Sequence, residues 1–129
     1  MSYSLSSLAA ILESKSKLLF PEREIAEPVY DTRKVRNPEK ALFVALKGRR
    51  DGHEYVSEAY QAGIRAFLLE RKVNLPSDAD QVVVQNPLEA LQKMAASHRE
   101  TFKLPVIGIT GSNGKTTVKE WLFHLLSEQ

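Results

Sequence analysis

One unbroken apolar run constrains the fold more than any other feature of the sequence. Leu42–Leu46 holds consecutive apolar residues, with Pro38 before it and Gly48 after it. A strand with one wet face alternates apolar and polar residues, so a run without alternation predicts a strand that is covered on both faces. Ala66–Leu69 and Gln81–Val84 have the length of two further strands. The sequence therefore predicts a sheet with cover on both sides.

Helices with recognisable ends lie between these runs. A first helix is predicted after the N-cap Ser4, and a second lies between the capping pair Asp51 and Glu54 and the terminal glycine Gly63. A third begins at Asn86, which is followed by proline at the first helical position. The apolar face expected for the first helix is Leu5, Leu8, Ala9 and Leu12. The one expected for the third helix is Leu88, Leu91, Ala95 and Phe102. Strands that alternate with helices indicate an α/β fold.

Composition excludes several classes of protein. The formal net charge of +2 over 129 residues gives no basic stripe of the kind that nucleic acid requires. No apolar stretch is long enough to span a membrane, and the first residues lack the pattern of a secretory signal. The absence of cysteine removes disulfides, thiolate zinc sites and cysteine nucleophiles. We therefore expect a cytoplasmic protein without a nucleic-acid partner.

A glycine-rich segment carries most of the functional information. Val106–Ile109 is predicted to be a short buried strand, and Thr110–Thr117 (TGSNGKTT) joins it to a last helix. Such a turn exposes consecutive backbone N–H groups at the positive end of a helix dipole, where phosphate binds. Gly111 and Gly114 allow the backbone conformations that this turn needs.

The residues that follow Gly114 add to the phosphate site. Lys115 would place a positive charge beside the β- and γ-phosphates, and the Thr116 hydroxyl would ligate Mg²⁺. The strict P-loop has a glycine five positions before Gly114, but Ile109 occupies that position. A glycine-rich turn with an incidental lysine is the structural alternative.

The segment resembles the ATP-binding loop of the Mur ligases, the family that builds the peptide stem of peptidoglycan. The loop of that family also lacks the first P-loop glycine, so Ile109 agrees with the resemblance. The resemblance implies ATP and Mg²⁺ as cofactors, with Lys115 and Thr116 as catalytic residues and Thr116 on the Mg²⁺ that accompanies ATP. The ATP-binding residues that it implies are Thr110, Gly111, Ser112, Asn113, Gly114, Lys115, Thr116 and Thr117.

A second set of motifs resembles the same family. Asp31–Arg33, Leu42–Gly48 and Asp51–His53 are similar to the N-terminal domain that holds the UDP end of the nucleotide-sugar substrate. The residues that the resemblance implies for UDP-substrate binding are Thr32, Arg33, Gly48, Arg49 and Arg50. Read from the residues alone, Asp31 can instead cap a turn beside solvated arginines.

Within the family, the chain is most similar to the branch that joins D-alanyl-D-alanine to UDP-MurNAc-tripeptide. The resemblance implies that ATP phosphorylates the terminal carboxylate of the substrate and that the amine of the dipeptide then attacks. This chemistry needs positioning and charge stabilisation rather than a protein nucleophile, and the sequence contains no nucleophile–base pair. The alternatives are the branch that adds a single amino acid and an unrelated P-loop nucleotide-binding protein.

The chain is expected to contain one domain and the beginning of another. We expect a small α/β domain at residues 1–86, and at residues 87–129 the opening helix, strand, P-loop and helix of a truncated central ATPase domain. This fragment alone is expected to be inactive. Its apolar residues, including Trp121 as a core residue, should pack back on the first domain or drive self-association. His53, His98 and His124 lack metal-ligand spacing and are expected to be structural or surface residues.

Overall fold

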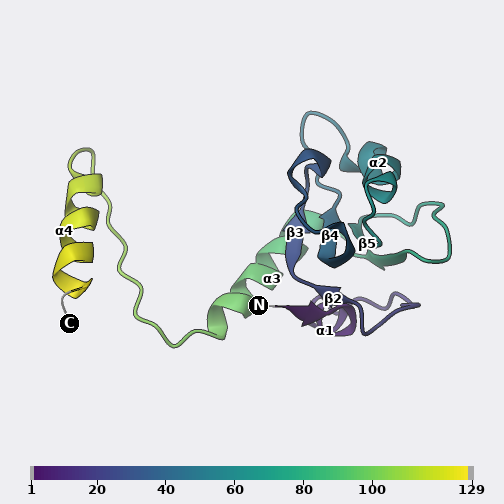
Figure 1. Ribbon diagram of the computed structural model, residues 1–129, viewed down its shortest axis with the longest axis horizontal. Helices are drawn as coiled ribbons and strands as arrows, with labels where there is room; N and C mark the ends of the chain where they lie inside the picture. The colour runs from purple at the N-terminus through teal and green to yellow at the C-terminus, as the bar shows by residue number, and fades with distance from the viewer. Residues whose placement is uncertain (1, 128–129) are drawn as a thin grey trace.

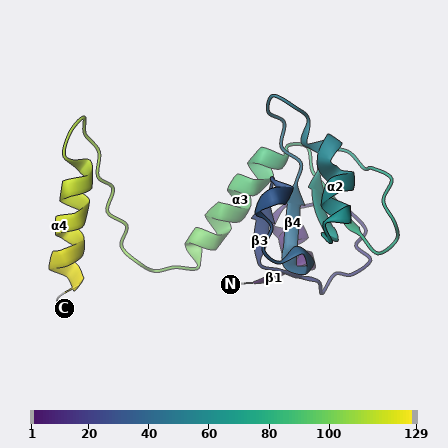
Figure 2. The same ribbon diagram turned by 45° about the horizontal axis from the view of Figure 1, so that its top comes forward.

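The computed structural model describes residues 2–127 and consists of an α/β body and a C-terminal arm. The body contains residues 2–102, and we use "the arm" for residues 103–127. The last helix lies apart from the sheet in both views (Figures 1 and 2). Met1 and residues 128–129, which belong to the two predicted domains, lie outside the described residues. The predicted boundary near Asn86 stays a prediction.

A four-stranded parallel sheet forms the centre of the body. Its strands are β3 (Glu27–Val29), β4 (Ala41–Val44), β5 (Ala66–Leu69) and β6 (Asp80–Val83), and they lie side by side in this order. The predicted strands at 42–46, 66–69 and 81–84 are therefore confirmed to within two residues. The edge strand β3 contains a proline, which an edge tolerates because one side of it needs no ladder hydrogen bonds.

Short helices and a two-stranded ladder complete the body. The helices are α1 (Leu5–Ile11), α2 (Val56–Gln61) and α3 (Pro87–Glu100). Single 3₁₀ turns occur at η1 (Thr32–Lys34), η2 (Pro38–Lys40) and η3 (Gly52–Tyr55), and β1 (Tyr3–Ser4) pairs antiparallel with β2 (Glu24–Ile25). The predicted N-caps Ser4 and Asn86 are confirmed, because each accepts a backbone N–H at the start of its helix. Asp51 caps the 3₁₀ turn η3 rather than the helix itself, and α2 begins directly after that turn.

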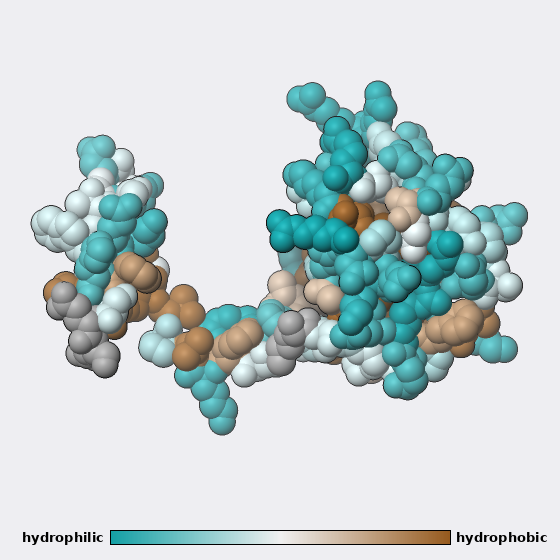
Figure 3. Space-filling model, in the orientation of Figure 1, coloured by the Kyte–Doolittle hydropathy of each residue, from teal (hydrophilic) through white to brown (hydrophobic). Residues whose placement is uncertain are grey.

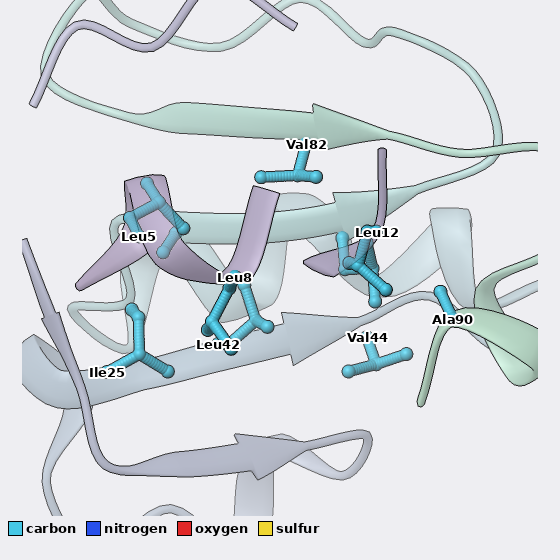
Figure 4. Close-up of a cluster of buried hydrophobic side chains, with 10 residues drawn as sticks. Leu5, Leu8, Leu12, Ile25, Leu42, Val44, Val82 and Ala90 are labelled. Atoms are coloured by element: carbon cyan, nitrogen blue, oxygen red, sulfur yellow. The ribbon is translucent and has the colours of Figure 1, made fainter. Parts of the chain in front are cut away.

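The sheet is covered on both faces, as the apolar run predicts. One face packs on α1 and α3, and Figure 4 shows Leu8 of α1 beside Leu42 of β4. The other face packs on α2, where Phe43 and Phe67 are fully buried. Neighbouring residues of β4 thus enter opposite cores, which explains why the strand has no polar position.

A buried carboxylate fastens the segment before β2 to the sheet. Asp80 is 1% exposed, and its Oδ1 accepts the backbone N–H groups of Leu19 at 2.6 Å and Phe20 at 3.3 Å. Its Oδ2 has no hydrogen-bond partner among the described residues and lies 3.6 Å from Nε of Arg23. The guanidinium compensates the buried charge.

Replacing Asp80 with alanine is expected to lower the free energy of unfolding by about 3 kcal/mol, because it strands two backbone N–H groups and the Arg23 charge. Asp80→Asn keeps one acceptor oxygen and should cost less. Urea unfolding of the two variants measures the difference. Equal losses would show that the charge, and not the Oδ1 hydrogen bonds, matters at this position.

The arm differs from expectation. Val106–Ile109 is not a strand, and Val106 is 72% and Ile107 61% exposed. Trp121, expected in the core, is 68% exposed on α4 (Lys115–Ser127). Figure 3 shows the apolar residues of the arm gathered at its surface. A strand needs neighbours for its backbone groups, and the sheet of the body offers none at the arm.

The expectation that the arm packs back on the body is therefore wrong. The residues concerned include Val106, Ile107, Val118 and Leu125, all of which are exposed. Self-association of the chain stays a prediction, which sedimentation would test. Within residues 2–127, no helix has both the length and the apolar character needed to cross a membrane.

The buried face of α3 also differs from the predicted stripe. Leu88 is 52% and Phe102 43% exposed, whereas Pro87 and Ala90 are buried and Leu91 packs against the core. The helix is anchored at its far end by His98, whose Nδ1 lies 2.8 Å from the Tyr3 hydroxyl. Ala90, Leu91 and Met94 pack on the same core as α1, so the buried face of α3 includes Ala90 and Met94, which the predicted stripe lacked.

Candidate functional site

The glycine-rich segment has the backbone geometry of an anion-binding turn. Gly111 has φ +151° and Gly114 has φ +76°, so both occupy the region that favours glycine, as the sequence predicts. The helix α4 starts at Lys115, and its first helical hydrogen bond runs from the N–H of Val118 to the carbonyl of Gly114. The N–H groups of Lys115 and the next two residues precede this bond and point out of the helix end.

The side chains beside this turn suit a triphosphate and its metal ion. A hollow of about 300 Å³ is lined by Lys115, Thr116 and Lys119 together with Ile107 and Ile109. Two ammonium groups and the open helix end donate hydrogen bonds that suit phosphate oxygens, and the Thr116 hydroxyl is an oxygen ligand of the kind that Mg²⁺ takes. ATP and Mg²⁺ therefore fit these residues. Lys119 is a residue that the sequence reasoning did not assign, although its i+4 spacing from Lys115 places it on the same helix face.

The second candidate region is a cavity of about 450 Å³ beside η1. Asp31 caps this turn by accepting the backbone N–H of Arg33 at 3.1 Å. Arg33 donates to both carboxylate oxygens of Asp31, each at 2.9 Å. Its side chain is 84% exposed. The side-chain hydrogen bonds from Arg33 hold the pKa of Asp31 below its ordinary value.

Residues of η1, η3 and α2, with two residues that precede η1, line the cavity. They are Tyr30, Asp31, Thr32, Arg33, Tyr55 and Glu58. The Thr32 hydroxyl donates to Oε1 of Glu58 on α2, which ties η1 to that helix. Tyr30, Tyr55 and Glu58 were missed by sequence reasoning, although the i+3 spacing of Tyr55 and Glu58 would have placed these two on one helix face.

The loop at Gly48–Arg50 lies next to this cavity. Arg50 donates to the Tyr55 hydroxyl at 3.3 Å, and this bond raises the pKa of Arg50. Arg49 is exposed, and a side chain at Gly48 would meet no atom within 4 Å. The structure therefore brings Thr32, Arg33 and Arg50 to the lining and rim of one cavity, with Arg49 beside them on the loop.

A carboxylate-centred network fixes the end of this loop. Asp51 accepts the backbone N–H of His53 at 3.0 Å and bonds to Nδ1 of the His53 ring at 2.6 Å. Its second oxygen accepts from Arg71 at 2.8 Å. The ring Nε2 accepts the N–H of Glu70 at 3.2 Å, so Nδ1 carries the proton that Asp51 accepts. His53 is buried and structural, as expected.

This network predicts loss of stability in acid. The backbone N–H of His53, then Arg71 and the His53 ring, hold the pKa of Asp51 well below its ordinary 3.8. A lowered carboxyl pKa contributes stability above the unfolded-state value, and this contribution is lost as pH falls below it. Thermal unfolding from about pH 5 to about pH 2 should therefore show a smaller fall in melting temperature for Asp51→Asn than for the unmodified chain. Parallel curves would exclude Asp51 as a source of the acid sensitivity.

The two candidate regions lie in different parts of the chain. The phosphate-type turn precedes α4 on the arm (Figure 1). The cavity beside η1 is lined by residues of the body alone. Among residues 2–127, no group of three or more His, Asp or Glu side chains is arranged to hold a metal ion. A Mg²⁺ ion at Lys115–Thr116 would therefore take most of its ligands from elsewhere, such as phosphate oxygens and water.

Comparison with known proteins gives a consistent set of relatives. No family model matches the chain. The UDP-N-acetylmuramoyl-tripeptide–D-alanyl-D-alanine ligase of Bacillus subtilis is 43% identical over 101 residues, which are 77% of this chain and 22% of the relative. The ligase of the same name from Rickettsia prowazekii is 48% identical over 86 residues, 66% of this chain and 19% of the relative. The chain thus spans about a fifth of the length of these relatives.

Solved structures agree with these sequences. A UDP-N-acetylmuramoylalanyl-D-glutamyl-2,6-diaminopimelate–D-alanyl-D-alanyl ligase from Acinetobacter baumannii superimposes with a TM-score of 0.83 at 31% identity. The match covers 99% of this chain and 28% of that one. A MurF ligase from Thermotoga maritima in complex with ADP has a TM-score of 0.65 at 36% identity, over 80% of this chain and 23% of that one.

Proposed function

The chain belongs to the Mur ligase family, and we propose that it is the nucleotide-binding part of an ATP-dependent ligase that adds D-alanyl-D-alanine to UDP-MurNAc-tripeptide. One observation carries the proposal. The same chain holds a left-handed glycine turn at the start of a helix and a separate cavity rimmed by arginines. A ligase of this kind needs one site for a phosphoryl donor and one for a nucleotide-linked acceptor.

The arm supplies the groups for the phosphoryl donor. Bound ATP supplies the phosphoryl group that activates a substrate carboxylate. The exposed N–H groups at the start of α4 would hold phosphate oxygens, and Lys115 would neutralise their charge. Thr116 would hold one Mg²⁺ through its hydroxyl. Support comes from the relative from Thermotoga maritima, whose structure holds ADP.

The body supplies the groups for the UDP end of the acceptor. Arg49 and Arg50 lie on a loop whose ends are fixed by β4 and by the Asp51 network. Two guanidinium groups on a held loop suit a diphosphate, because charge-assisted bonds are about twice as strong as neutral ones and little ordering is needed. Since both cations are exposed, affinity should weaken as salt rises.

Titration of two ligands tests the proposal directly. UDP-MurNAc-tripeptide should bind this chain in calorimetry and shift amide NMR signals around Asp31–Arg33 and Gly48–Arg50. ATP with Mg²⁺ should shift those of Thr110–Thr117. An unrelated P-loop protein would bind the nucleotide triphosphate alone. Binding of neither ligand would overturn the proposal.

Two substitutions separate the sites in a full-length ligase that contains this chain. Thr32→Ala and Arg49→Ala should raise KM for the UDP substrate several-fold and leave KM for ATP nearly constant, since both residues lie in the body. Steady-state kinetics with each substrate varied in turn measures the two constants. Equal effects on both constants, or none on either, would assign these residues to folding or to the solvated surface.

A further inference from the structure

The cavity beside η1 is chemically unlike the arginine loop that adjoins it. Its lining holds the carboxylates Asp31 and Glu58 and the guanidinium of Arg33. Arg33 is already paired with both oxygens of Asp31. The lining of the cavity therefore has no unpaired guanidinium that could bind a phosphate, and its carboxylates would repel one. A neutral group with N–H donors suits it better than an anion.

The cavity also has the flat apolar surface that a nucleobase needs. The Tyr30 ring lies at its edge and is 63% exposed, and the Lys34 ammonium lies 6.0 Å from the ring centroid. Tyr55, the last residue of η3, is half-buried, and its hydroxyl accepts a hydrogen bond from Arg50. Exposed aromatic rings stack on bases and contribute about 1–3 kcal/mol each. Both tyrosines line the cavity, and Tyr55 joins it to the cationic loop through Arg50, so a base stacked here would lie near the cations.

Glu58 is positioned to read the edge of such a base. Its Oε1 accepts the Thr32 hydroxyl, which fixes the carboxylate at the cavity. Among the described residues, no hydrogen bond reaches Oε2. An ionised carboxylate only accepts hydrogen bonds, so the complementary base carries an N–H at the facing position. Uracil has this donor at N3, whereas cytosine presents a lone pair there.

We propose that Glu58 is a specificity-determining residue of the nucleotide site, which accepts the N3–H of uracil while Tyr30 stacks on the ring and Arg49 and Arg50 hold the diphosphate. The inference rests on the proposed function, because that function supplies UDP as the ligand. It divides the residues assigned to the UDP site into a base end at η1 and α2 and a phosphate end at the Gly48–Arg50 loop. Thr32 serves the base end by orienting Glu58.

Calorimetric titration with UDP and CDP tests the role of Glu58. The unmodified chain should bind UDP about tenfold more tightly than CDP, since an unpaired or opposed polar group at a partly exposed site costs about that factor. Glu58→Gln should bring the ratio of the UDP affinity to the CDP affinity close to one, because an amide can accept from uracil N3–H or donate to cytosine N3. Glu58→Ala should lower the affinity for UDP about tenfold and change the affinity for CDP little.

A matched control removes the effect of net charge. Glu54→Gln makes the same change on the neighbouring turn η3, where the side chain is exposed and does not line the cavity. It should leave the UDP-to-CDP ratio unchanged. Glu58 is itself exposed, so melting temperatures of all variants should agree within about 2 °C, which shows that the fold is intact.

Stacking by Tyr30 is tested with a ligand that has no base. Tyr30→Ala should lower the affinity for UDP at least fivefold and leave the affinity for inorganic pyrophosphate unchanged. Tyr30→Phe keeps an aromatic ring and should keep the affinity for UDP. A UDP-to-CDP ratio that survives Glu58→Gln would overturn the role of Glu58 and leave the proposed function standing. Failure of the unmodified chain to bind UDP at all would overturn both.

Discussion

Replacing Lys115 with alanine in a full-length ligase that contains this chain is expected to lower kcat by about two to three orders of magnitude, the loss typical of removing one charge-stabilising donor. Lys115 is the first residue of α4 and lines the hollow beside the glycine turn. Its ammonium would stabilise charge that develops during phosphoryl transfer, so kcat should fall far more than the affinity for the UDP substrate. Steady-state kinetics and calorimetry with UDP-MurNAc-tripeptide measure the two quantities.

Lys103→Ala is the matched control for this experiment. Lys103 carries the same charge on the same arm, is exposed, and does not line the hollow at Lys115. Its replacement should leave kcat within about twofold, since surface substitutions usually have small effects. If Lys115→Ala retained substantial ligase activity, the assignment of Thr110–Thr117 to ATP would be wrong.

The body could be predicted from the sequence because its signals are local. Ser4 and Asn86 each start a helix through an oxygen that accepts a nearby N–H. The apolar run at Leu42–Leu46 needs cover on both faces wherever it lies, and the two cores provide it. Gly63 has φ +100° at the end of α2, as a terminal glycine requires. Each of these features is decided within a few residues.

The arm could not be predicted in the same way, because its apolar residues find no cover among residues 2–127. Val106–Ile109 has the composition of a strand, but a strand forms only beside another strand. Trp121 has the spacing of a core residue, yet the described chain has no surface against it. Apolar periodicity indicates which face of an element will be covered. It does not specify the covering element.

The two candidate sites differ in the same way: one is formed by neighbouring residues in the sequence and the other by tertiary packing. The turn at Gly111–Lys115 is formed by consecutive residues, and the sequence predicted its conformation. The cavity beside η1 joins Tyr30 to Glu58 through tertiary packing, so the motif Asp31–Arg33 indicated its place but not its lining. Only the structure shows that Arg33 is paired with Asp31, and this pairing is why we propose Arg49 and Arg50, rather than Arg33, for the diphosphate.

Gly52 is the position at which a small side chain should damage the body most. A Cβ atom there would lie 2.7 Å from both the backbone N and O of Leu46 and 2.8 Å from the carbonyl carbon of Ala45. These atoms belong to the two residues that directly follow β4; Ala45 is buried in one core and Leu46 packs against the other, so this backbone cannot move aside cheaply. The N–H of Gly52 also donates to the Leu46 carbonyl at 2.9 Å, so the close approach is part of the fold.

Gly52→Ala is expected to lower the free energy of unfolding by about 3 kcal/mol, the upper end of typical overpacking costs. The melting temperature should fall by more than about 10 °C for a body of this size. Gly48→Ala is the control, since a Cβ at Gly48 meets no atom within 4 Å, and its melting temperature should stay within about 2 °C. The shift at Gly52 displaces the cap residue Asp51 and the adjoining arginine loop, so UDP affinity should fall together with stability. A Gly52→Ala chain as stable as the Gly48→Ala chain would mean that the turn at Gly52 yields without disturbing β4.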